Sequence, residues 1–443
     1  MTKNSPAVPG GIKFGPIDLM PGVTRGNMWS LAWGAFMTIG ILAFVAVATP
    51  YVLTANLGIP ESEQGTITGD LVFWAEVTQI LIFGLVGVAA DRVGRNWLFA
   101  MGLLGMGAAY TFYPFAESIG ELTIYRVIYA IGLGTSTGML ATVTADYPQE
   151  DSRGKMLAFI GFLNGLGVIL IIALLGNLPG VLVEAGYSDI SAGRYTHAVA
   201  VVACVVTALV IGFGLMKGTP VRPEDRLPVL QLFRSGIREG SNPRIALAYA
   251  SGFVSRGDQV ILGTFVILWG KTWAISQGMD PAEAIAVGTL LFVIAQTSAL
   301  LWIPLLGVIL DRVNRVTGLI ACMSFATAGY LGTAFVDDPT ARAAIPAFVL
   351  LGIGQISAFL GSATLIGQEA PQSERGSVVG VFNTCGAIGI LIASSIGGRL
   401  FDTFGPSGPF LLVGAFNAVV LLMAIAVRIL SPGPMRVVSN RGQ

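Results

Sequence analysis

The sequence predicts an all-α membrane protein of twelve transmembrane helices, arranged as two copies of a six-helix unit. Three observations lead to this prediction. Hydrophobic residues make up 54% of the 443 residues and charged residues only 11%, whereas about 25% of a typical soluble protein is charged. Twelve stretches are long and apolar enough to cross a bilayer, and a set of motifs from the first half of the chain returns in the second half at a nearly constant spacing.

The composition also excludes several classes of function. The 25 basic residues balance the 25 acidic ones, so no net charge recruits nucleic acid. The cysteines, Cys204, Cys322 and Cys385, lie in apolar runs without a CxxC pair, so neither a disulfide framework nor a zinc site is expected. His197 is the only histidine, and we expect it to be solvated near the outer end of its span. Without a nucleophile–base pair or a phosphate-binding loop, we expect neither an enzyme nor a bound cofactor or metal.

The transmembrane spans come in two groups of six, separated by a polar interval. A helix needs about 20 mostly apolar residues to cross the hydrocarbon core of a bilayer. The predicted spans are 29–53, 66–90, 97–115, 122–147, 155–178, 195–216, 245–269, 282–310, 317–335, 341–368, 377–400 and 409–430.

These spans divide the chain into five parts. The parts are a cytoplasmic N-terminal tail at 1–28, an N-terminal bundle at 29–216, a cytoplasmic linker at 217–244, a C-terminal bundle at 245–430 and a cytoplasmic C-terminal tail at 431–443. In the linker, Leu230, Phe233 and Ile237 recur at helical spacing among charges, which indicates a helix lying at the membrane surface. A flexible linker is the alternative.

The basic residues of the loops predict the orientation of the chain. If the N-terminus is cytoplasmic, 19 of the 25 Lys and Arg residues fall on the inner side, and four, including Lys271, on the outer side. Positive residues favour the cytoplasmic side of a membrane, so both termini are expected there. The absence of long outer loops with glycosylation sites favours a multi-pass protein of the bacterial inner membrane.

Internal duplication is the strongest signal in the sequence. The run GVAADRVGR at 87–95 returns as GVILDRVNR at 307–315, which is 220 residues later. A polar turn at 146–154 is matched by a similar one at 369–376. Matches in one order at one spacing indicate two copies of a six-helix unit.

The repeated residues form a candidate cytoplasmic gate. Asp91 and Asp311 end a span, where each carboxylate can face the positive N-terminus of a neighbouring helix. Such contacts would hold the cytoplasmic side shut; the alternative is that the charges only anchor loops. Gly94 and Asn314 are residue types that tolerate a left-handed turn. The gate residues are Gly87, Asp91, Arg92, Gly94, Arg95, Asp146, Arg153, Asp311, Arg312, Arg315, Glu369 and Arg375.

These motifs resemble the signature of the major facilitator superfamily. The pattern GxxxDRxGR after the second span resembles that signature, and Arg126 followed by Gly132 and Gly134 resembles the family's motif in span four. The resemblance covers about 30–430. It implies two pseudo-symmetric six-helix bundles in a single working chain, a substrate site between the bundles near the midplane, and alternating access by rocking of one bundle against the other.

Several ionisable residues lie inside predicted spans, and four of them are candidates for function. Glu76, Arg256 and Asp258 fall near the middle of a span and Arg126 near an outer end. A charge at the bilayer centre costs about 2.5–3.5 kcal/mol on insertion scales, so such residues are functional candidates. We expect Arg256 to bind an anionic group, and Glu76 or Asp258 to take up and release a proton. The alternative is that Arg256 pairs permanently with Glu76 or Asp258.

The resemblance directs further polar and aromatic residues toward the transport pathway. Spans one, four, seven and ten usually line the cavity in this superfamily, together with parts of their neighbours. Arg256, Asp258 and Arg126 then face the pathway, Asn164, Asn383, Gln296 and Gln355 would add neutral hydrogen bonds, and Trp33 and Trp74 would stack on a substrate.

Three hypotheses of function follow. The first is a secondary active transporter of a small organic, anionic solute, driven by protons. The second is a proton-driven exporter of amphipathic or lipophilic compounds, in which the buried charges serve coupling. The third is a membrane sensor that binds a ligand without transporting it and signals through the linker.

Overall fold

The computed structural model describes residues 11–218, 229–371 and 374–431, with side chains except at 83–85, 87–88, 91–92, 229–233 and 375. The predicted gate positions Gly87, Asp91, Arg92 and Arg375 therefore lie outside the described side chains. The chain forms two compact units: unit 1 combines Met1–Glu224 with Ala274–Val293, and unit 2 combines Asp225–Trp273 with Ile294–Gln443.

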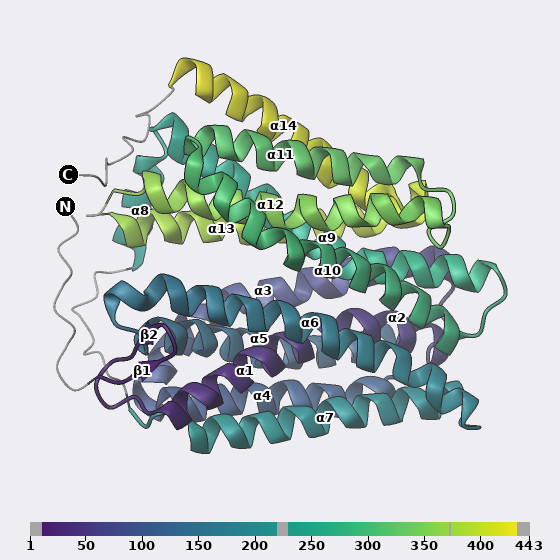
Figure 1. The fold of residues 1–443 in the computed structure, drawn as a ribbon. Helices are drawn as coiled ribbons and strands as arrows, with labels where there is room; N and C mark the ends of the chain where they lie inside the picture. Colours follow the sequence, from purple (N-terminus) through teal and green to yellow (C-terminus); the bar gives the residue numbers. More distant parts are fainter. Residues whose placement is uncertain (1–10, 219–228, 372–373, 432–443) are drawn as a thin grey trace. The chain divides into compact units, whose positions relative to one another are not determined.

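Unit 1 contains the first six predicted spans. Its elements are β1 (Lys13–Phe14), β2 (Ile17–Asp18), α1 (Arg25–Ala43), α2 (Val45–Ala55), α3 (Glu61–Val93), α4 (Arg95–Phe112), η1 (Tyr113–Phe115), α5 (Ile119–Asp146), η2 (Glu150–Ser152), α6 (Arg153–Glu184) and α7 (Asp189–Gly214) (Figure 1). Stretches of α9 and α10 on either side of their connecting turn also belong to this unit.

Unit 2 contains the other six spans except the first part of α10, and a short helix precedes them. Its elements are α8 (Val229–Glu239), α9 (Pro243–Ser276), α10 (Pro281–Arg312), α11 (Arg315–Gly332), η3 (Thr333–Phe335), η4 (Arg342–Ala344), α12 (Ile345–Glu369), α13 (Arg375–Phe404) and α14 (Gly408–Leu430).

The helices confirm the predicted fold class. Among the described residues, 11 helical segments are long and apolar enough to cross a membrane, with α1 and α2 counted as one segment. The second predicted span, 66–90, lies within α3, a helix of 33 residues. Together these helices account for the twelve predicted spans.

The first span is broken near its middle, at Phe44 between α1 and α2. Two buried tyrosines donate hydrogen bonds to carbonyls next to the break: Tyr110 to Ile41 at 2.7 Å and Tyr129 to Leu42 at 2.6 Å. Pro50, nearly two turns further on, has no N–H to continue the helical ladder. Side chains that bond into the ladder are a known cause of helix kinks, so we attribute the break to these tyrosines and this proline.

Both units pack their first helix against their fifth through a glycine. Gly167 of α6 lies against the carbonyl of Phe36 in α1, and Gly389 of α13 lies against the carbonyl of Phe253 in α9. In each case an added Cβ would collide with backbone. Small residues allow membrane helices to approach this closely, and the same pair of helices packs through a glycine in each unit.

The two interhelical turns of the repeat differ in conformation. Gly94 adopts the predicted positive φ of 91° between α3 and α4. For Asn314 the expected left-handed conformation is wrong, because its φ is −59°. The Asn314 side chain instead caps α11 by accepting a hydrogen bond from the N–H of Val316 at 3.0 Å, the usual role of Asn at a helix N-terminus.

Part of the predicted N-terminal tail is folded onto unit 1. The β1–β2 hairpin lies beside the ends of α1 and α6 (Figure 1). The chain after β2 pairs with the turn between α5 and α6: the N–H of Met20 donates to Tyr147 and the N–H of Gln149 donates to Asp18, both at 2.8 Å. Ile17, Leu19 and Val23 are buried in the core of the unit. This packing has no periodic signal in the sequence.

Candidate functional site

The predicted site residues divide between the two units. Glu76, Arg126, Asn164, Trp33 and Trp74 belong to unit 1, whereas Arg256, Asp258, Gln296, Gln355 and Asn383 belong to unit 2.

Asp258 is enclosed inside unit 2. Its side chain has no exposed surface. One carboxyl oxygen, Oδ1, accepts a hydrogen bond from the amide of Asn417 in α14 at 2.7 Å, and Oδ2 has no hydrogen-bond partner among the described residues. Tyr330 of α11 donates to the backbone carbonyl of Asp258 at 2.7 Å. Asp258 therefore lies among α9, α11 and α14, with no surface open to a solute.

Arg256 lies two residues earlier on α9 and has different surroundings. Its guanidinium carbon is 5.1 Å from the ring centroid of Phe359 in α12, and Nη1 donates to Gln259 at 3.2 Å. The side chain is half-buried, and its stem packs on Gly386 of α13. This leaves Arg256, unlike Asp258, partly open to its surroundings.

Arg126 is a buried cation in unit 1. It is 7% exposed, and its guanidinium carbon lies 5.1 Å from the ring centroid of Tyr129. In the described part of the chain, neither Nε nor Nη1 of Arg126 has a hydrogen-bond partner. Cation–π contact offsets part of the desolvation of a guanidinium, and the tyrosine that provides it also bonds to the broken first span.

The remaining polar candidates of unit 1 lie along α3 and α6. Glu76 is half-buried and accepts a hydrogen bond from Gln79 one turn later, at 3.2 Å. Asn164 is half-buried, and its Oδ1 has no partner among the residues that the structure describes. Trp33 and Trp74 are 40% and 50% exposed, so both rings present open faces.

The remaining polar candidates of unit 2 differ mainly in exposure. Gln355 in α12 is buried, Gln296 in α10 is half-buried and Asn383 in α13 is exposed. Each of these residues lies on a spanning helix, and among the described residues none of the three is a hydrogen-bond partner of the Asp258 side chain.

The predicted gate residues of unit 1 pair within the unit. Arg95 at the start of α4 forms an ion pair with Asp146 at the end of α5. Both side chains are largely buried, at 16% and 14% exposure. Arg153 instead pairs with Glu150 at 3.0 Å on the surface. The turn between α3 and α4 is thus joined to the turn between α5 and α6.

The equivalent residues of unit 2 are arranged differently. Arg315 at the start of α11 donates to the neutral amide of Gln368 at 2.7 Å, next to Glu369, and lies 3.9 Å from the exposed Asp311. Glu369 pairs with Arg244 of α9 at 3.2 Å. Arg312 is exposed. The arginine that begins the third spanning helix of each unit therefore has a different partner at the end of the fourth. Arg95 pairs with the carboxylate of Asp146 in unit 1, whereas Arg315 bonds to the amide of Gln368 in unit 2.

Three buried polar residues escaped the sequence analysis. The expectation that His197 is solvated is wrong: it is 2% exposed and stacks on Tyr113, with ring centroids 6.1 Å apart. Asn417 is the partner of Asp258, and Lys271, assigned to an outer loop, is fully buried in α9. A single polar residue hardly changes the mean hydropathy of a spanning segment, so hydropathy does not detect these three residues. The repeat does connect two of them, because Asn417 follows His197 by 220 positions.

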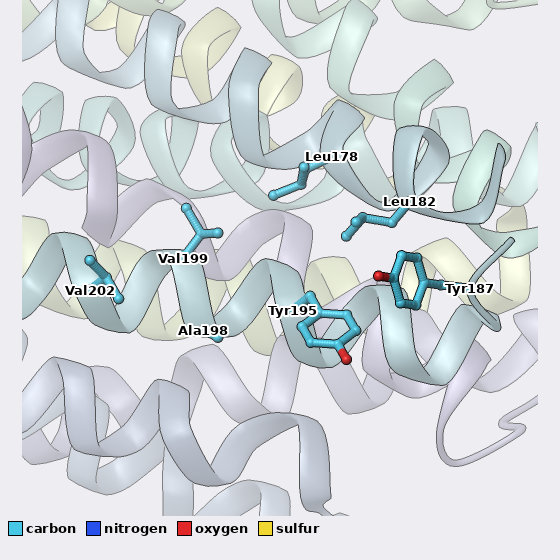
Figure 2. Close-up of a pocket in the computed structure, with 7 residues that line it drawn as sticks. All are labelled: Leu178, Leu182, Tyr187, Tyr195, Ala198, Val199 and Val202. Carbon is cyan, nitrogen blue, oxygen red and sulfur yellow. The ribbon is translucent and has the colours of Figure 1, made fainter. Parts of the chain in front are cut away.

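The pocket in Figure 2 is separate from these residues. It has a volume of about 400 Å³ and lies between α6 and α7 of unit 1. Its lining is apolar except for two tyrosine hydroxyls, and none of the predicted site residues contributes to it. The lining residues are Leu178, Leu182, Tyr187, Tyr195, Ala198, Val199 and Val202 (Figure 2).

Among the residues that the structure describes, no group of three or more His, Cys, Asp or Glu side chains comes together. The site candidates are instead isolated charges and amides on membrane-spanning helices, in two units that repeat each other. These features define a helical membrane transport protein.

The chain belongs to the Major Facilitator Superfamily, whose family model matches residues 31–394 and 251–443. It is a membrane transporter and not an enzyme. It is 28% identical over 403 residues to magnetosome protein MamH of Paramagnetospirillum magneticum, covering 89% of each chain. It is 24% identical over 418 residues to magnetosome protein MamZ of the same organism, covering 90% of this chain and 62% of MamZ.

A solved structure of the nucleoside transporter NupG has the same fold. The TM-score is 0.72 at 11% identity, with 91% of this chain and 99% of that chain covered.

Proposed function

We propose that this transporter moves a small organic anion by alternating access and couples that movement to protons. The observation that carries the proposal is the enclosed carboxyl group of Asp258, whose side chain is held by the neutral amide of Asn417.

The surroundings of Asp258 fit a protonated carboxyl group. An ionised carboxylate in a low-dielectric interior is costly unless several donors or a cation stabilise it. Here Oδ1 accepts one hydrogen bond and Oδ2 none from the described residues. A proton on Oδ2 removes the buried charge. A conformational change that brings water to Asp258 would release this proton, so each transport cycle would carry one proton.

The anionic charge of the solute is proposed from the two arginines. Arg256 offers a guanidinium held by a ring and an amide, and a guanidinium binds carboxylate or phosphate through a planar fork. Arg126 adds a second positive charge within the spanning helices of unit 1. One relative is named as the staphyloferrin B transporter of Staphylococcus aureus, with 22% identity over 414 residues.

A second candidate function is the export of amphipathic compounds. The exposed rings of Trp33 and Trp74 favour it, since aromatic faces bind flat apolar molecules. A multidrug resistance protein, MdtG of Escherichia fergusonii, is 25% identical over 316 residues.

Reconstituted protein with the substitution Asp258→Asn tests the coupling. Asparagine resembles a protonated aspartic acid in shape and can still accept the bond from Asn417, so this variant should fold. Uptake of labelled carboxylates and sugar phosphates into proteoliposomes is measured with an imposed pH gradient. The variant should lose uptake driven by the gradient while exchange across a membrane without a gradient persists. The exposed loop variant Asp338→Asn serves as the control. Uptake by Asp258→Asn that still follows the gradient would disprove the coupling role.

The two candidate functions respond differently to the substitution Arg256→Gln. Transport of an anion should fall at least tenfold, because the charge that binds it is gone. Export of the amphipathic cation ethidium should persist. Ethidium export that persists in the variant, together with anion transport that Arg256→Gln leaves unchanged, would favour the second candidate.

The location proposed from the sequence is a bacterial inner membrane with both termini in the cytoplasm. The relatives MamH and MamZ are named magnetosome proteins, so the magnetosome membrane is a second candidate location. Separation of membrane fractions from the source cells, followed by detection of the tagged chain, distinguishes the two locations.

A further inference from the structure

The short helix α8 is held against the end of α13 by one face. Gly236 lies so close to the carbonyl of Ser377 that a Cβ would collide with it. The hydroxyl of Ser235 donates to Glu374 at 2.7 Å, and the hydroxyl of Tyr249 donates to the carbonyl of Gly236 at 2.7 Å. These contacts fix which side of α8 faces unit 2.

The same contacts fix the depth of α8 relative to the membrane. Only the turn at 240–242 joins α8 to α9, and three residues reach at most about 10 Å. Tyr249 lies in the second turn of α9, and Val381, which also faces Gly236, lies in the second turn of α13. Both residues fall inside predicted apolar spans. The predicted span boundaries therefore put α8 at the edge of the hydrocarbon core, next to the lipid headgroups, a layer of roughly 5–7 Å per leaflet.

The other side of α8 presents two arginines and an isoleucine. Arg234 and Arg238 are exposed and lie one turn apart, so they share a face. Ile237, between them in the sequence, is 55% exposed. Neither arginine forms an ion pair with another residue in the described parts of the chain, which distinguishes them from Arg244, the next arginine, which pairs with Glu369.

We propose that this face of α8 binds the headgroups of anionic phospholipids. An amphipathic helix at headgroup depth places its apolar residues against the acyl chains and its basic residues among phosphates. Each basic residue near an anionic membrane surface strengthens binding about fivefold. An acidic soluble protein would also match the charge, but it would leave Ile237 unburied at the boundary of the hydrocarbon core. A lipid surface offers phosphates to Arg234 and Arg238 and acyl chains to Ile237.

Lipid-dependent thermal stability of the full-length protein tests this proposal. The purified protein is placed in nanodiscs of phosphatidylcholine alone or with 30% phosphatidylglycerol, and its unfolding temperature is measured. Phosphatidylglycerol should stabilise the wild-type protein, and 0.5 M NaCl should reduce the effect, because salt screens these charges. The double variant Arg234→Gln/Arg238→Gln should lose most of this response and bind added phosphatidylglycerol about 25-fold more weakly in native mass spectrometry.

Two matched variants make the result specific. Arg342→Gln/Arg399→Gln removes two arginines with exposed side chains outside α8 and should keep the wild-type response. Arg234→Lys/Arg238→Lys keeps the charge and should retain most of it. An equal response of the wild-type protein and the Gln variant to phosphatidylglycerol would overturn the proposal. So would stabilisation by soluble polyglutamate that phosphatidylglycerol does not reproduce, because that result would assign the face to an acidic protein.

Discussion

The hydroxyl groups of Tyr110 and Tyr129 bond to the first span next to its break. Each donates to a carbonyl just before the break at Phe44, and each ring is buried in unit 1. Inside a bilayer a carbonyl without a donor is costly, since water does not replace the missing bond. These two hydrogen bonds therefore tie the first span to α4 and α5 next to the break.

Removal of one of these hydroxyl groups should destabilise unit 1. Tyr129→Phe keeps the ring and leaves the carbonyl of Leu42 without its 2.6 Å donor, at a cost of about 1–3 kcal/mol. The unfolding temperature should fall by a few degrees. The control Tyr195→Phe changes an exposed tyrosine in α7 and should leave it unchanged. Equal unfolding temperatures for the two variants would show that the bond does not stabilise the bend.

The repeat preserves the positions of buried polar residues but changes their chemistry. Tyr110 and Tyr330 are 220 positions apart, and both donate to a backbone carbonyl of the first helix of their unit. At the same spacing, Thr38 of α1 corresponds to Asp258 of α9, and both are fully buried. Only unit 2 has an ionisable group at this position. This asymmetry supports a proton site in unit 2.

At the scale of elements, the hairpin of unit 1 joins the start of α1 to the turn between α5 and α6. Besides the backbone pairing, the hydroxyl of Ser152 accepts from the N–H of Asp18 at 2.9 Å, and the amide of Gln149 donates to the carbonyl of Leu19 at 2.9 Å. The ring of Phe14 packs edge-on against Trp29, with centroids 5.3 Å apart. These contacts predict that the hairpin and the turn move together.

Substitutions in the turn should release the hairpin. Gln149→Ala/Ser152→Ala removes both side-chain contacts, and trypsin should then cut after Lys13 several times faster, because cleavage requires the strand to leave its partner. In the control variant Glu150→Ala, only the exposed pair with Arg153 is lost, and such pairs contribute about 0–1 kcal/mol. A hairpin that is cut equally fast in wild type and double variant would not be held by these bonds.

The turn of unit 1 also carries a buried ion pair, which predicts strong coupling between Arg95 and Asp146. Asp146→Asn leaves the charge of Arg95 without its carboxylate, whereas Arg95→Gln/Asp146→Asn removes both charges. Because a buried charge without its partner is costlier than a neutral pair, the double variant should be more stable than Asp146→Asn. A double-mutant cycle on unfolding temperature measures this coupling. Additive effects would show that the pair is screened by solvent.

The fold of the whole molecule could be predicted because it depends on long-range averages. Span length, apolar content and the spacing of 220 are properties of many residues, and each survives local exceptions such as Glu76 in α3. The site depends on single residues whose environment is tertiary. Asp258 and Arg256 are two positions apart in one helix, yet one is enclosed and the other half-exposed, because different helices pack on their sides of α9. The hairpin at 13–18 was missed for the same reason, since its strands have two residues each.

The orientation of the whole molecule remains a prediction, and it rests on the distribution of basic residues. The predicted spans put 19 Lys and Arg residues on one side of the membrane and four, including the buried Lys271, on the other, and this bias predicts the topology. Alkaline phosphatase, which is active only outside the cytoplasm, should be active when inserted after Asp338, between η3 and η4, and inactive after Lys217. Green fluorescent protein fused after Gln443 should fluoresce. Reversed activities at the two insertion points would contradict the orientation and would place α8 at the outer leaflet. The prediction of the helices and of the repeat does not depend on this result.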